Sequence, residues 1–216
     1  MAKVSPSILA ADFVNLERDI HQIEASQADW IHVDVMDGSF VPNFSFGLPA
    51  LKAVRRVTDM PLDVHLMIER PIRYVERFVA AGADWLTIHI EADTRENTME
   101  ALKKIRSMGS KAGISLKPGT GAEEALPYLS LCDLVLVMTV QPGFGGQKFK
   151  EDMMPKLAAL RRCLDDVNPG CVLSVDGGID DITAPICKQN GAEILVTGSA
   201  YFRAADQKAY VRRLQA

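Results

Sequence analysis

Short apolar runs alternate with longer amphipathic stretches along the whole chain. The runs are rich in β-branched residues, and their lengths are typical of parallel strands buried on both faces. The sequence predicts strands at residues 4–10, 30–36, 61–67, 85–90, 111–116, 134–138, 171–176 and 193–199. It predicts helices between them at 14–26, 71–81, 95–108, 151–166 and 181–190. Such a regular alternation indicates an α/β fold with a parallel sheet.

A weak internal repeat marks the junctions between helices and strands. The chain reads QADW at 27–30, GADW at 82–85 and GAEI at 191–194, and glycine is common where a helix ends. The alternation within 216 residues, with no linker and no shift in composition, favours a single-domain (β/α)8 TIM barrel over residues 1–216. An open, doubly wound sheet is the alternative.

Composition and charge narrow the classes of partner. The chain is 48% hydrophobic and 24% charged with a formal net charge of −4, so it offers no basic surface for nucleic acid. It has neither the apolar core of a signal peptide nor an apolar run long enough to cross a bilayer. Cys132, Cys163, Cys171 and Cys187 lack metal-finger spacing and are expected to be reduced packing residues. We therefore expect a cytoplasmic protein that binds neither nucleic acid nor membrane. We also expect a homo-oligomer, because symmetric assembly is common among such barrels.

Four polar side chains lie near the carboxyl ends of predicted strands, where barrel enzymes carry their chemistry. His32 and Asp34 belong to the strand at 30–36, His65 to the next strand, and Asp176 ends the seventh. Alternate residues of a strand face the same side, so all four can point into the barrel. Two imidazoles and two carboxylates suit one divalent ion such as Zn²⁺, Fe²⁺, Mn²⁺ or Co²⁺. The alternative, purely structural burial, is disfavoured because unpaired buried charge is costly.

Other ionisable residues are expected to have structural roles. His89, at the end of the strand at 85–90, is interpreted as pocket wall or as a neighbour of the metal ligands. His21 is interpreted as a solvent-facing helix residue. Asp37 and Asp180 are interpreted as loop or helix-cap residues.

Glycine-rich segments follow the last three predicted strands: QPGFGGQ at 141–147, DGGI at 176–179 and TGSA at 197–200. Glycine lets backbone N–H groups approach an anion, and barrels often bind phosphate in the loops after their last two strands. The sequence therefore predicts a phosphate site. Ser199 could add a hydroxyl donor or merely cap a helix, and Lys148 is expected on the solvated surface.

Met36, Met67 and Met138 each lie at a strand end. Flexible core filling is the usual role of methionine. At the mouth of a pocket these side chains would instead cover a reacting carbon and exclude water. We treat the three methionines as the expected pocket lid.

Together these features predict chemistry on a small sugar phosphate. A bound metal would polarise a ketone and ease the removal of a neighbouring C–H proton. One of Asp34 and Asp176 would take that proton and the other would return a proton to the opposite face; a positioned acid or base typically contributes about 10²–10⁴-fold. The expected outcome is inversion at one carbon.

Eight motifs over nearly the whole length are shared with a known family. They are SPSILAADF (5–13), HVDVMDG (32–38), FVPN (40–43), DVHLM (63–67), KPGT (117–120), VMTVQPGFGGQKF (137–149), VDGGI (175–179) and GSA (198–200). On these motifs the chain resembles the ribulose-phosphate 3-epimerases, isomerases of the pentose phosphate pathway that interconvert D-ribulose 5-phosphate and D-xylulose 5-phosphate. The resemblance implies a ribulose-phosphate-binding (β/α)8 barrel and a metal-dependent, two-carboxylate inversion at C3 through an enediolate.

The resemblance also implies residue roles. It implies one divalent metal held by His32, Asp34, His65 and Asp176, with Asp34 as proton acceptor and Asp176 as proton donor. The implied substrate-binding residues are Ser7, His65, Gly143, Phe144, Gly145, Gly146, Asp176, Gly177, Gly178, Gly198 and Ser199. Three positions, Ala10, Gln27 and Ser39, depart from the common family pattern. The difference at Ser39 concerns the shape of the loop after the second strand.

Three alternative functions are open at this point. A sister epimerase would act on a six-carbon ketose phosphate such as D-allulose 6-phosphate. A barrel decarboxylase or aldolase would be expected to use a strand-end lysine, for which Lys117 is the obvious candidate. A non-catalytic barrel would bind a sugar phosphate without turnover.

Overall fold

Eight parallel strands form one sheet in the computed structural model, which describes residues 1–216. The strands are β1 (Lys3–Pro6), β2 (Ile31–Met36), β3 (Leu62–Met67), β4 (Trp85–His89), β5 (Lys111–Leu116), β6 (Leu134–Met138), β7 (Val172–Asp176) and β8 (Ile194–Thr197). Their order in the sheet is β1-β8-β7-β6-β5-β4-β3-β2. A parallel bridge between Ser7 and His32 then brings β1 next to β2. The sheet therefore closes into a barrel, which confirms the predicted TIM fold and makes the doubly wound alternative wrong.

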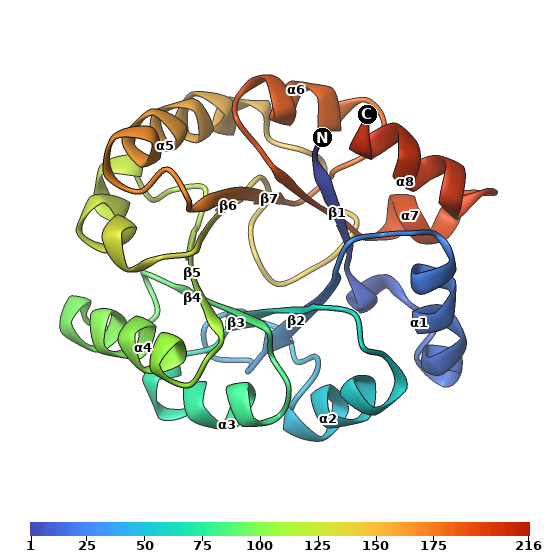
Figure 1. The fold of residues 1–216 in the computed structure, drawn as a ribbon, viewed down its shortest axis with the longest axis horizontal. Coiled ribbons are helices and arrows are strands. Elements are labelled where there is room, and N and C mark those ends of the chain that lie inside the picture. The colour runs from blue at the N-terminus through green and yellow to red at the C-terminus, as the bar shows by residue number, and fades with distance from the viewer.

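Helices surround the ring of strands (Figure 1). The α-helices are α1 (Leu16–Ala25), α2 (Leu48–Val57), α3 (Val75–Ala80), α4 (Arg95–Ser107), α5 (Met154–Val167), α6 (Thr183–Gln189), α7 (Ser199–Arg203) and α8 (Gln207–Gln215). The 3-10 segments are η1 (Ile8–Ala10), η2 (Phe13–Asn15), η3 (Pro71–Arg73), η4 (Ala122–Leu131) and η5 (Glu151–Met153). None of these helices is long and apolar enough to cross a membrane.

The five predicted helices are all present, but three of them begin with a 3-10 turn, at η2, η3 and η5. The helices α2, α7 and α8 and the 3-10 segment η4 were not predicted from the sequence. The η4 segment contains Pro127, which lacks an N–H donor and clashes with the preceding turn of an α-helix. The last predicted strand also ends early, at Thr197, because Gly198 begins the turn into α7.

Both faces of the strands are covered, and β2 shows the consequence. All six of its residues are buried. Ile31, Val33 and Val35 belong to the large apolar cluster that joins the strands to the surrounding helices. His32 and Asp34 have the opposite parity and point into the barrel. The helices thus cover one face of β2, and its polar residues lie on the other.

The lumen of the barrel below these polar residues is filled with apolar side chains. Trp30 and Trp85 stack there, with ring centroids 4.6 Å apart. They pack in one cluster with Leu134, Leu136 and Ile194. Since this cluster occupies the amino-terminal part of the lumen, the polar groups gather at the carboxyl ends of the strands, as the sequence predicted.

All four cysteines are free. Burial raises the pKa of the Cys171 and Cys187 thiols to about 12 and that of Cys132 well above its usual value. These three residues are packing residues, as predicted, whereas Cys163 is partly exposed.

Candidate active site

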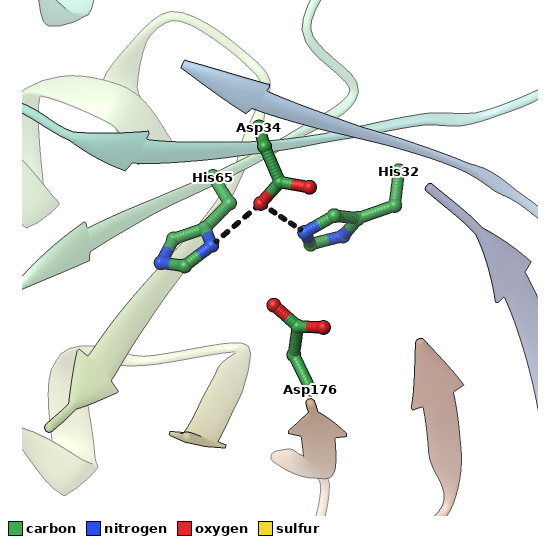
Figure 2. A group of neighbouring side chains, drawn as sticks. All are labelled: His32, Asp34, His65 and Asp176. Carbon is green, nitrogen blue, oxygen red and sulfur yellow. Dashed lines mark hydrogen bonds and ion pairs between the residues drawn. The ribbon is translucent and has the colours of Figure 1, made fainter. Parts of the chain in front are cut away.

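Four side chains converge at the carboxyl end of the barrel. His32 and Asp34 come from β2, His65 from β3 and Asp176 from the end of β7. One nitrogen or oxygen of each lies within 4.8 Å of the corresponding atoms of the others. Figure 2 shows Asp34 between the two imidazoles, with Asp176 approaching from the opposite side. The predicted meeting of these four residues is therefore observed.

Asp34 is at the centre of this cluster. Its Oδ1 lies 3.2 Å from Nε2 of His32 and 3.2 Å from Nδ1 of His65. Its Oδ2 accepts a hydrogen bond of 2.5 Å from the Ser7 hydroxyl. Asp34 is almost fully buried, so these partners fix the orientation of its carboxylate.

The two carboxylates of the cluster have pKa values shifted in opposite directions. Burial and the neighbouring charge of Asp34 raise the pKa of Asp176 to about 6. Burial also opposes ionisation of Asp34, but the contacts with His32 and His65 outweigh it and lower the pKa of Asp34. Pairs of groups with separated pKa values are typical of acid–base sites.

The donor set fits a divalent transition metal. Two imidazole nitrogens and two carboxylate oxygens are ligands that such ions accept. Nδ1 of His32 lies 2.7 Å from Oδ2 of Asp63, so its other nitrogen faces the cluster. A histidine that binds a metal through one ring nitrogen usually donates the N–H of its other nitrogen to a carboxylate or a similar acceptor. Burial opposes protonation of His32, but Asp34 and Asp63 raise its pKa well above the usual value, so these two carboxylates favour positive charge at the ring.

A cavity of about 750 Å³ opens at this end of the barrel. Asp34 and Asp176 line it, together with the three methionines predicted as a lid, Met36, Met67 and Met138. The predicted substrate-binding residues that also line it are Ser7, Gly143, Phe144, Gly145, Gly146, Gly177, Gly178, Gly198 and Ser199. His65 is fully buried and is not among the lining residues. Its contact with a substrate stays a prediction.

The three glycine-rich loops form one side of the cavity. Gly146 and Gly178 have φ values of +71° and +66°, a left-handed conformation that side chains rarely adopt. Ser199 is the first residue of α7 and Gly198 is its N-cap, so Ser199 is not the helix cap. Lys148 is exposed, as predicted, and lies at the rim of the same cavity.

Four further ionisable residues lie where the sequence predicted them. His89 lies behind the cluster, with its Nε2 2.9 Å from Nε2 of His65. His21 is exposed on α1. Asp37 and Asp180 accept backbone N–H groups in their loops.

Two carboxylates behind the cluster were not singled out from the sequence. Asp63 supports His32, and Oε2 of Glu91 lies 3.1 Å from Nδ1 of His89. Burial opposes ionisation of Glu91, but its hydrogen bonds lower its pKa to about 2. Asp63 stands two residues before His65 in the motif DVHLM, and its inward parity was the available signal.

Comparison with known proteins decides the family. The model of the ribulose-phosphate 3 epimerase family matches residues 3–202. The chain belongs to the ribulose-phosphate 3-epimerase family. It is 45% identical to the ribulose-phosphate 3-epimerase of Bacillus subtilis (strain 168), over 100% of the chain and 99% of that relative. It is 47% identical to that of Rhodobacter capsulatus, over 93% of the chain and 86% of that relative. The prediction of an isomerase of this family is confirmed.

Solved structures outside the epimerase family share the fold. A 3-hexulose-6-phosphate synthase from Salmonella typhimurium superposes with a TM-score of 0.71 at 18% identity, covering 99% of this chain and 96% of that one. KGPDC from Streptococcus mutans gives a TM-score of 0.71 at 13% identity, covering 100% of this chain and 96% of that one. At these identities the likeness supports the barrel architecture of this epimerase-family chain alone.

Proposed function

We propose that this protein interconverts D-ribulose 5-phosphate and D-xylulose 5-phosphate by inverting C3, with a divalent metal in the His32, Asp34, His65 and Asp176 cluster. The observation that carries the proposal is the pair of carboxylates, Asp34 and Asp176, which reach one cavity from β2 and β7. Family membership supports the substrate and the reaction.

Asp34 and Asp176 are assigned the two proton transfers. Asp34 takes the C3 proton of ribulose 5-phosphate, which leaves an enediolate, and Asp176 delivers a proton to the opposite face of C3. The roles exchange in the reverse direction. The hydrogen bond from Ser7 holds Asp34 in place. When bound, the metal supplies Lewis-acid polarisation of the ketone.

The rest of the cavity is assigned to binding and water exclusion. The loops that carry Gly146, Gly178 and Gly198 present backbone to the cavity and would receive the phosphate. The lid methionines Met36 and Met67 are nearly fully buried. They would cover the reacting carbon and strengthen the electrostatic interactions within the site.

The contacts of Lys117 argue against a lysine-dependent decarboxylase or aldolase. Its Nζ lies 3.6 Å from the centroid of the Phe40 ring, and Lys117 is not among the residues that line the cavity. We therefore expect Lys117→Met to leave proton exchange at C3 intact.

Turnover in heavy water tests the proposed reaction. We expect ribulose 5-phosphate to yield xylulose 5-phosphate that carries deuterium at C3, because carboxylates at an open cavity exchange protons with solvent. Proton NMR follows the loss of the C3 signal, and D-allulose 6-phosphate is assayed in parallel. Faster turnover of the six-carbon substrate would reassign the enzyme to the sister epimerase. Binding of either sugar phosphate without turnover would show that the protein is a non-catalytic sugar-phosphate-binding barrel.

Gly178→Ala tests the phosphate loop. A Cβ at this position would lie 2.7 Å from the backbone nitrogen of Phe149, at a φ of +66°. We expect a loss of roughly 1–3 kcal/mol of stability from the strained backbone, and at least about a tenfold rise in KM with a smaller change in kcat, as for lost ground-state binding. Urea unfolding and steady-state kinetics measure the two effects.

Gly170→Ala is the matched control. A Cβ there meets no heavy atom within 4 Å, and the residue lies in the turn before β7, so stability and KM should both stay near those of the wild type. The same outcome for Gly178→Ala would contradict the assignment of the phosphate loop.

A further inference from the structure

A row of hydrogen-bonded side chains extends from His65 away from the cavity. Nε2 of His65 lies 2.9 Å from Nε2 of His89, and Nδ1 of His89 lies 3.1 Å from Oε2 of Glu91. Both imidazoles are fully buried. Because each ring nitrogen in the row has a single partner, the positions of the protons along it follow from the acceptor at the far end, Glu91.

Glu91 determines the proton position at the far end. Its Oε1 accepts the backbone N–H of Lys117 at 2.7 Å and the hydroxyl of Thr120. An ionised carboxylate can only accept hydrogen bonds. Nδ1 of His89 must therefore carry the proton that lies between His89 and Glu91.

The same direction then continues to His65. A neutral imidazole protonated on Nδ1 has its lone pair on Nε2, so Nε2 of His89 accepts a hydrogen bond from Nε2 of His65. With its single proton on Nε2, His65 has its lone pair on Nδ1, and because the Asp34 carboxylate opposite can only accept, a proton or a metal ion must lie between the two. Nδ1 of His65 lies 3.2 Å from Oδ1 of Asp34, inside the four-residue cluster (Figure 2).

We propose that His89 and Glu91 are positioning residues that keep the proton of His65 on Nε2, so that its Nδ1 lone pair is available to a metal ion. The inference rests on the proposed metal-dependent function and adds to it. His32 is oriented directly, through the contact between its Nδ1 and Asp63. His65 is oriented indirectly, by the carboxylate of Glu91 acting through the imidazole of His89.

Glu91→Gln should reverse the direction of the hydrogen bonds in this row, because glutamine has nearly the shape of glutamate but carries a donor. The atom at the position of Oε1 must still accept the N–H of Lys117, so the amide oxygen takes that place. The amide nitrogen then faces His89 and donates to Nδ1. His89 carries its proton on Nε2 and donates it to His65, whose own proton moves to Nδ1, where it blocks the lone pair.

Two measurements test the proposal. Titration of the metal-free full chain with Co²⁺, followed by visible absorption, should show affinity about 10–100-fold lower in Glu91→Gln, which is the usual loss when an outer partner of a histidine ligand is altered. Glu123→Gln is the matched control, because Glu123 is exposed on η4, and it should bind Co²⁺ as the wild type does.

The second measurement needs no variant. The protein has four histidines, so ¹⁵N-histidine labelling gives a sparse imidazole spectrum. In the metal-free wild type we expect a proton on Nε2 of His65 and on Nδ1 of His89, whereas in Glu91→Gln Nε2 of His65 carries no proton and the proton of His89 is on Nε2. A merely structural contact would not move these signals, and the wild-type spectrum decides even if the variant fails to fold.

Two results would overturn the inference: wild-type Co²⁺ affinity in a folded Glu91→Gln, or a wild-type His65 without a proton on Nε2. Failure of the proposed function is a separate outcome. It would appear as a wild type that binds Co²⁺ yet turns over no sugar phosphate, while Glu91→Gln still weakens the binding of Co²⁺.

Discussion

Replacement of Asp176 by asparagine is expected to lower the rate of epimerisation by about 10⁴-fold, the upper end of what one positioned acid or base contributes. The amide has the shape of the carboxylate but cannot deliver the proton to the opposite face of C3. Asp34, which lies on β2, would still line the cavity. We therefore expect the variant to exchange the C3 hydrogen of ribulose 5-phosphate with heavy water, slowly and without forming xylulose 5-phosphate.

Proton NMR of the sugar measures exchange and epimerisation in the same sample. Asp166→Asn, which changes an exposed carboxylate on α5, is the control and should retain the wild-type rate. Circular dichroism verifies that both variants are folded. Near-full epimerisation by Asp176→Asn would refute the two-carboxylate scheme, since a single remaining base returns a proton to the face from which it came.

Removal of the metal is expected to reduce turnover by at least about 10³-fold, because Lewis-acid stabilisation is worth several kcal/mol and each 1.36 kcal/mol is tenfold in rate. Dialysis against a chelator, followed by elemental analysis, gives the metal-free enzyme. Adding back Zn²⁺, Fe²⁺, Mn²⁺ or Co²⁺ one at a time should restore activity and identifies the ions that support it. Unchanged turnover in protein shown to be metal-free would contradict the metal-dependent proposal.

Metal binding should also raise the melting temperature, because a ligand of the folded state stabilises it, by about 2.7 kcal/mol at one hundred times its Kd. His32→Gln removes a proposed ligand and should abolish the rise. His21→Gln alters an exposed histidine on α1 and should leave the rise intact. Equal shifts in both variants would place the metal elsewhere.

Strand parity made the centre of the site predictable from the sequence. In β2 the residues that pack against the helices are β-branched and the alternate ones are polar, so the inward direction of His32 and Asp34 could be inferred. The closed barrel then required Asp176, far away in the sequence, to meet them. The glycine-rich loops were predictable for a similar reason, since three of them follow neighbouring strands.

The supporting residues were harder to predict because their roles depend on packing between strands. Asp63 begins the motif DVHLM and looks like an ordinary acidic residue near the start of a strand until the register places it opposite His32. Glu91 follows β4 in a loop, and only the contact between His65 and His89 links it to the cluster. Helices α2, α7 and α8 and the segment η4 were also not predicted. For η4 the reason is local, because Pro127 within it is unusual in a helix.

The stacked indoles of Trp30 and Trp85 have a kinetic consequence. Because these side chains fill the amino-terminal part of the barrel, a sugar can reach the site only from the carboxyl end. One epimer must therefore dissociate before the other can bind. The two sugars should therefore compete for the empty enzyme, and each should inhibit the conversion of the other in proportion to its own affinity.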